Sequence, residues 1–194
     1  MSKGRLEAFS DGVIAIILTI MVLELRPPHE SEISALAGLV PHFLAYLLSF
    51  AFVGIYWNNH HHLLQTARKV NGAILWANLH LLFWLSLIPA TTAWLGEHPA
   101  EPWPVALYGI DLLGAAVAYT ILSGTLVRHH GQDSLLARAL GADFKGKLSL
   151  AAYALAVAAA FLLPWVSCAL YVAVAIVWLV PDRRIERLFV ELDG

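Results

Sequence analysis

The sequence predicts an all-α integral membrane protein with six transmembrane helices and with both termini in the cytoplasm. Hydrophobic residues make up 59% of the 194 residues and charged residues only 13%, a balance that suits a bilayer and not a soluble domain of this size. Six apolar runs alternate with short polar breaks, and lysine and arginine collect in alternate breaks. Residues 1–194 are therefore expected to form one six-helix unit that leaves no room for a catalytic domain, so we expect no enzyme.

The first predicted span, residues 9–25, is short and begins with polar residues. Asp11 interrupts its apolar stretch, and Glu24, Arg26 and a Pro-Pro pair follow where a signal peptide would have a small-residue cleavage site. We therefore expect this segment to remain as the first membrane helix and not to be removed.

The other five spans follow apolar runs whose lengths approach the ~20 residues that a helix needs to cross the hydrocarbon core. They cover residues 34–57, 73–95, 105–127, 148–163 and 165–180. The fifth is rich in alanine, which favours close helix packing. A corner at Pro164 separates it from the sixth, which predicts a tight helical hairpin.

The basic residues predict the orientation, because cytoplasmic loops carry the excess of lysine and arginine. Eleven of the twelve fall on one side of the predicted spans: Lys3, Arg5, Arg68, Lys69, Arg128, Arg138, Lys145, Lys147, Arg183, Arg184 and Arg187. The opposite side has Arg26 and five glutamates: Glu24, Glu30, Glu32, Glu97 and Glu101. This acidic rim is either ordinary loop charge, the simpler interpretation, or a means of concentrating cations at a pore mouth. No basic tail points to nucleic acid.

The first helix is unusual because it places an ionisable group, Asp11, at the start of an apolar stretch. Such groups are costly at membrane depth and generally face protein or a water-filled path. At ~100° per residue, Ile16, Thr19, Ile20 and Leu23 share one narrow stripe, and Asp11 lies on the far side. On spacing alone, an aliphatic stripe of this kind is core packing or a lipid face more often than a pore lining.

The polar start of this helix resembles a known signature. Arg5, the triplet Phe9-Ser10-Asp11, Gly12 and Ala15-Ile16 resemble the RxxxFSDG motif of the transmembrane protein 175 family of potassium channels. A charged FSD triplet that opens a membrane helix is rare, so the signature is specific.

Two later stretches resemble the same family. Trp57 and His60, in the run YWNNHH, are similar to the pattern of its second helix. Asn78, the LSLIP run that ends at Pro89, and Thr92 are similar to its third helix. The resemblance covers residues 5–92 in the expected order, whereas the C-terminal half agrees only in its number of spans.

The resemblance implies a homotetramer in the cell (inner) membrane, with the first helix of each subunit lining a central pore. It implies a hydrophobic constriction at Ile16, further layers at Ile20 and Leu23, and a polar contribution from Thr19, in place of the TVGYG loop of other potassium channels. The implied function is modestly selective potassium conduction with no cofactor and no metal other than permeant potassium. Glu24 is expected to attract cations at the outer mouth.

The remaining motif residues are expected to hold the first helix in position: Arg5, Phe9, Ser10, Asp11, Trp57, His60 and Asn78. The first helix begins at the cytoplasmic face, the second ends there and the third starts there, so Asp11, Trp57, His60 and Asn78 should lie at similar depth. Tryptophan, histidine and asparagine supply the donors that a carboxylate needs. The alternative for Asp11 is a direct cation ligand at the inner mouth.

Two other classes of function stay open. In a proton- or ion-coupled transporter, Asp11 or Asp111 would be the coupling carboxylate, although Asp111 is more simply interpreted as reaching water or Tyr108. In a membrane redox protein, haem would lie between His60 or His62 and His80. Consecutive histidines point ~100° apart on a helix, so His60, His61 and His62 do not share one ion.

Overall fold

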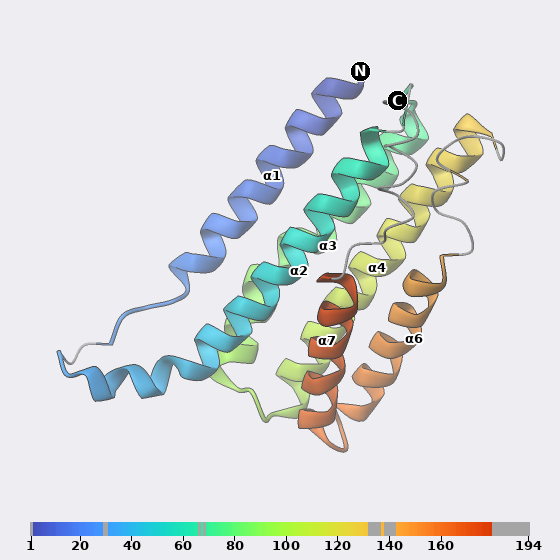
Figure 1. Cartoon of the computed structure of the whole chain (residues 1–194). Coiled ribbons are helices and arrows are strands. Elements are labelled where there is room, and N and C mark those ends of the chain that lie inside the picture. Colours follow the sequence, from blue (N-terminus) through green and yellow to red (C-terminus); the bar gives the residue numbers. More distant parts are fainter. Residues whose placement is uncertain are drawn as a thin grey trace.

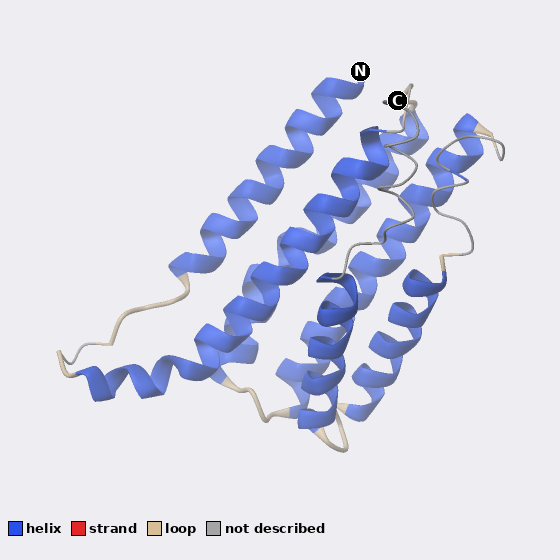
Figure 2. Ribbon diagram, viewed as in Figure 1, coloured by secondary structure: helices blue, strands red, loops and turns tan. Residues whose placement is uncertain are grey.

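The structure, a computed structural model, describes residues 2–28, 31–65, 67, 69–131, 137 and 143–179. The elements are α1 (Lys3–Leu23), the 3₁₀ helix η1 (Ile33–Leu39), α2 (Val40–Gln65), α3 (Gly72–Glu97), α4 (Pro102–His130), α6 (Phe144–Ala159) and α7 (Pro164–Leu179). Every regular element in the described ranges is helical (Figure 2). Six of the charged residues that the orientation used lie outside these ranges: Glu30, Arg68, Arg138, Arg183, Arg184 and Arg187.

The helices run side by side as a bundle (Figure 1), which confirms an all-helical fold. Within the described residues, four helical stretches are long and apolar enough to cross a membrane: Lys3–Leu23, Ile33–Gln65, Gly72–Glu97 and Pro102–His130. The helices α6 and α7 have 16 residues each, about 24 Å, which is less than the ~30 Å of a hydrocarbon core. The count of six spans and the cytoplasmic termini stay predictions.

Each of the four long helices extends past its predicted span at one end or both, because a helix continues into the interface where hydropathy has already fallen. α1 begins at Lys3 and not near residue 9, since the polar motif itself is helical. α3 begins after Asn71, whose side chain accepts a hydrogen bond from the backbone N–H of Ile74 at 3.0 Å. α4 begins at Pro102, where the missing N–H of proline costs nothing.

Two apolar cores hold the bundle together. One joins α1, α2, α3 and the C-terminal half of α4, and α1 lies at the edge of this group (Figure 1). The other joins α4 to α6 and α7, where the ring of Tyr171 meets Tyr108 edge-on and lies tilted against Tyr153. Gly109 permits this second contact, because a Cβ there would collide with the Tyr171 hydroxyl, which donates to the Val105 carbonyl at 3.0 Å.

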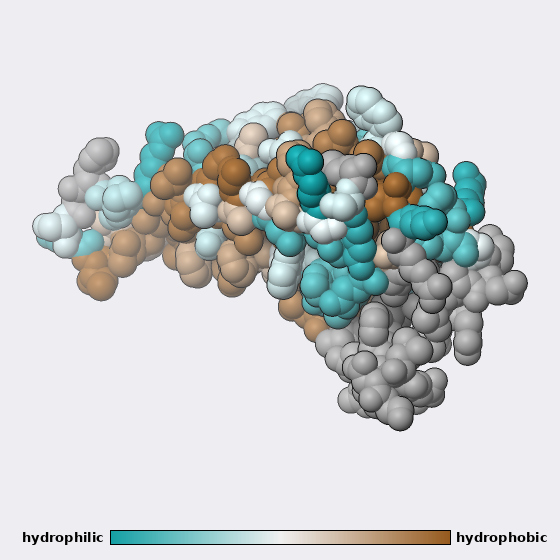
Figure 3. All heavy atoms as spheres, turned by 90° about the horizontal axis from the view of Figure 1, so that it is seen from above, coloured by the Kyte–Doolittle hydropathy of each residue, from teal (hydrophilic) through white to brown (hydrophobic). Residues whose placement is uncertain are grey.

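The outer surface of the helices carries many large apolar side chains, among them Phe43, Leu47 and Ile176, each more than half exposed. Seen along the bundle from the end where α1 begins (Figure 3), hydrophilic side chains gather on that end and hydrophobic surface runs along the arm toward η1. A soluble monomer does not expose apolar surface on this scale. The chain is therefore built to lie in a membrane as a multi-pass protein.

Candidate functional site

α1 presents two faces with different surroundings. Its inner face buries five side chains that recur every three or four residues and pack against α2 and α3: Leu6, Ser10, Ile14, Ile17 and Met21. On the opposite side, Ile16 is 58% exposed, Ile20 43% and Leu23 74%. The aliphatic stripe predicted from the sequence thus faces away from the rest of the chain. Its three side chains, on successive turns of α1, remain largely uncovered within one subunit.

Thr19 lies in the same exposed stripe. Its hydroxyl donates to the backbone carbonyl of Ile16 at 2.8 Å. Because a hydroxyl has one hydrogen and two acceptor lone pairs, this bond uses the hydrogen within the helix and leaves the oxygen able to accept or to bind a cation.

A buried chain of hydrogen bonds fastens the inner face of α1 to α2 and α3. The Asn78 amide donates to the Ser10 hydroxyl at 2.9 Å, and that hydroxyl donates to the Leu6 carbonyl at 2.9 Å. The Asn78 amide oxygen lies 2.6 Å from Nε2 of His60, and since an amide oxygen only accepts, Nε2 is the donor. The three polar side chains are at most 1% exposed.

Asp11 makes a separate contact on the rim of the same face. Its carboxylate accepts a hydrogen bond from the indole N–H of Trp57 at 3.0 Å, and both residues are exposed. The Trp57 ring in turn stacks on His61, with centroids 6.0 Å apart. The buried polar residue of the motif is therefore Ser10, whereas Asp11 is exposed.

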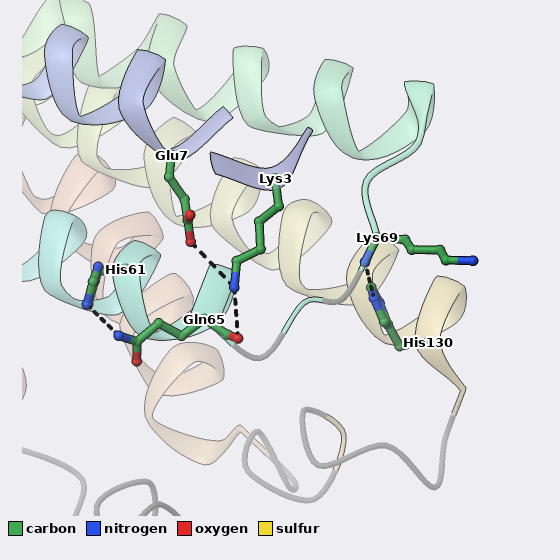
Figure 4. Close-up of polar contacts among 6 residues, drawn as sticks. All are labelled: Lys3, Glu7, His61, Gln65, Lys69 and His130. Atoms are coloured by element: carbon green, nitrogen blue, oxygen red, sulfur yellow. Dashed lines mark hydrogen bonds and ion pairs between the residues drawn. The ribbon is translucent and has the colours of Figure 1, made fainter. Parts of the chain in front are cut away.

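A third contact, which the sequence did not predict, lies where α1 begins (Figure 4). Nζ of Lys3 donates to the carbonyl of Gln65 at 3.0 Å and lies 3.6 Å from the carboxylate of Glu7. Gln65 is the last residue of α2, so its carbonyl has no partner within the helix and favours a cation. The predicted second span ended near residue 57, so Gln65 was not expected to end a helix.

The other predicted site residues take no part in these contacts. Arg5 and Phe9 are exposed, and their side chains make no hydrogen bond with a described residue. Phe9 projects from the same side of α1 as Ile16. Glu24 is exposed and forms the C-cap of α1.

The remaining polar candidates have protein partners. Nε2 of His80 accepts a hydrogen bond from the indole N–H of Trp84 at 3.0 Å, and His60 is bonded to Asn78, so these bonds use nitrogens that a haem iron would need. Asp111 is 2% exposed and bonded to Thr91, so the interpretation that it reaches water or Tyr108 is wrong.

Comparison with known proteins places these features in a family. The sequence model of the family described as the endosomal/lysosomal potassium channel TMEM175 matches residues 5–89. A potassium channel of Chryseobacterium sp. (strain P1-3) is 55% identical over 187 residues, which cover 96% of this chain and 97% of that protein. The human endosomal/lysosomal proton channel TMEM175 is 41% identical over 86 residues, 38% of this chain and 17% of the human protein.

A solved structure agrees with these matches. The crystal structure of a lysosomal potassium-selective channel TMEM175 homolog from Chamaesiphon minutus superposes with a TM-score of 0.78 at 30% identity. The superposition covers 92% of this chain and 96% of that one. The resemblance in the first three helices therefore extends to the whole fold, and the chain belongs to the TMEM175 family.

Proposed function

We propose that the protein is one subunit of a potassium channel, with four copies arranged so that α1 of each lines a central pore. Its bacterial relatives are named potassium channels, and its fold matches that of a potassium-selective channel homolog. The observation that carries the pore assignment is the exposed stripe of Ile16, Ile20 and Leu23 opposite the face that fastens α1 to its own chain. The channel would lie in the inner membrane and carry no enzymatic activity.

Four copies of Ile16 around an axis form an apolar ring. A narrow apolar ring excludes water until it widens, so it closes a pore by dewetting. Ile20 and Leu23 repeat this ring in the next two turns toward the outer end. We assign Ile16 as the gate and main constriction on this basis.

Selectivity in such a neck comes from the cost of removing water from the ion. Potassium holds its hydration shell less tightly than sodium, so an apolar constriction favours potassium without a cage of carbonyl groups. The Thr19 oxygen, whose hydrogen is engaged by the Ile16 carbonyl, can replace one lost water contact. Because one ring of hydroxyls replaces few of the waters, the preference for potassium should be modest.

The polar contacts of α1 would fix the rotation of this stripe about the helix axis. Ser10, Asn78 and His60 fasten the inner face, and the Trp57–Asp11 bond restrains its rim. The second role proposed for Asp11, a cation ligand at the inner mouth, is compatible with its exposure. Glu24, exposed at the outer end of α1, would attract cations there.

The test is potassium flux into liposomes that contain the purified protein, for the wild type and for Ile16→Asn. A polar ring wets more readily, so Ile16→Asn is expected to raise flux and to lower the preference for potassium over sodium. Val22→Asn is the matched control, because Val22 is exposed on α1 outside the stripe. Unchanged flux and selectivity in Ile16→Asn, or equal effects in both variants, would contradict the assignment.

The same liposomes separate a channel from a coupled transporter. Channel flux needs no gradient of a second ion, and single-channel currents in a planar bilayer exceed the turnover of any transporter. Cross-linking in the membrane tests the four-subunit assembly, which is expected to give bands up to a tetramer. Flux that depends on a second gradient, with no single-channel events, would favour the transporter.

A further inference from the structure

A second buried polar cluster lies away from α1, between α2, α3 and α4. Thr92 donates to the Ser49 hydroxyl at 2.7 Å, and Ser49 shares a hydrogen bond with the Tyr108 hydroxyl at 2.9 Å. Beside it, Thr91 donates to Oδ2 of Asp111 at 2.9 Å. The cluster includes one acidic side chain, and that side chain has no place in the proposed conduction path.

Asp111 is 2% exposed, and its second carboxylate oxygen, Oδ1, is buried with no hydrogen-bond partner. The one ion pair among the described residues is Lys3–Glu7, so no described lysine, arginine or histidine pairs with Asp111. The burial is complete within a single chain. A neighbouring subunit or a lipid headgroup therefore has no access through which to supply a counter-charge.

The ionisable groups around Asp111 are weak acids that stay neutral near pH 7. Tyr56 of α2 and Tyr108 of α4 lie near enough to interact with it electrostatically. Tyr153 of α6 and Tyr171 of α7 belong to the same apolar cluster as Tyr108, and Cys168 of α7 packs against that cluster.

α3 faces the carboxyl group with the non-ionising hydroxyl of Thr91. Its own ionisable residues lie elsewhere: His80 is bonded to Trp84, and Glu97 is exposed at the end of the helix. No basic side chain of the described residues therefore offsets a negative charge at this position.

An ionised carboxylate buried without a counter-charge is far more costly than a neutral polar group in the same place. Leu112 and Ala115, which lie near Asp111 on α4, are fully buried as well, so this part of the helix lies away from solvent. A proton bound to Oδ1 removes the negative charge without a counter-ion. We propose that Asp111 is a proton-binding site of the folded protein, occupied at neutral pH, with the proton on Oδ1 and the Thr91 hydrogen bond on Oδ2.

Asp11 provides an internal contrast. It is exposed, and its carboxylate accepts a hydrogen bond from the indole N–H of Trp57. The two aspartates therefore differ in their surroundings: Asp11 is exposed, whereas Asp111 is buried and only one of its two carboxylate oxygens has a hydrogen-bond partner.

The charge state is read directly by infrared spectroscopy of the purified protein in lipid at neutral pH. The carbonyl stretch of a protonated carboxylic acid is expected in the wild type, shifted in D₂O, and absent from Asp111→Asn. Asp11→Asn is the control and should leave that band in place. If Asp111→Asn does not fold, Thr91→Val serves instead, because loss of the hydrogen bond to Oδ2 should shift the band. A wild type without the band, or a band unaffected by either variant, would overturn the proposal.

A second measurement uses proton linkage. The unfolded chain ionises Asp111 near pH 7, so the folded state binds one proton more and its stability falls as the pH rises, by up to about tenfold in the unfolding equilibrium per pH unit. Asp111→Asn should lose this dependence, and Asp11→Asn should keep it. Identical pH profiles for the wild type and Asp111→Asn would count against the site. Neither assay measures ion flux, so the result does not depend on the proposed channel function.

Discussion

Asn78 is the residue through which three helices exchange hydrogen bonds, and its substitution is the sharpest test of how α1 is held. Asn78→Leu keeps a side chain of similar length and removes both bonds. Ser10 keeps its own acceptor, the Leu6 carbonyl, so it loses little. His60 is different: its N–H stays buried, at 1% exposure, with no acceptor.

The expected loss of folding free energy follows from this difference between Ser10 and His60. A buried donor left without a partner costs about 1–3 kcal/mol, whereas loss of a bond whose partners both find substitutes costs about 0.6 kcal/mol on average inside a membrane. Asn78→Leu should therefore lower the free energy of unfolding by about 1–3 kcal/mol. Trp57→Phe breaks an exposed bond to Asp11 and should cost under about 1 kcal/mol.

The assay is unfolding of the purified protein in mild detergent, by heat or by added sodium dodecyl sulfate. His60→Leu combined with Asn78→Leu is the decisive variant, since it removes the stranded donor and should recover part of the loss. If the double variant is less stable than Asn78→Leu by the full cost of His60→Leu alone, the two residues are not coupled and the reasoning fails.

Two further predictions concern other parts of the molecule. Thr19→Val should lower the potassium-to-sodium permeability ratio, measured from reversal potentials, because it removes the hydroxyl oxygen of the exposed stripe. Thr120→Val, on the exposed side of α4, is the control and should leave the ratio unchanged. Equal ratios in the wild type and both variants would refute the role of Thr19. Gly109→Ala should destabilise the fold by about 1–3 kcal/mol, because its new Cβ would collide with Tyr171. Gly124→Ala is the control and should be neutral or stabilising, because its Cβ would meet nothing within 4 Å. A melting temperature unaffected by Gly109→Ala would contradict this packing.

The sequence alone was sufficient to predict the features that depend on residues close together along the chain. Hydropathy predicted the helices, since an apolar run of ~20 residues has few alternatives in a membrane. Helical periodicity predicted that Ile16, Ile20 and Leu23 share a face, because 3.6 residues per turn is a local property. The motif around Asp11 predicted the family, which the matching relatives confirm.

Contacts between helices needed the tertiary structure, because they depend on how far each helix is rotated and shifted against the next. A shift of one residue turns a helix by ~100°, which is the difference between Ser10 and Asp11 as the buried member of the motif. The same applies to Asp111, which meets Thr91 on a different helix and not Tyr108 on its own. Periodicity shows which residues share a face, but the packing of the whole bundle decides what that face meets.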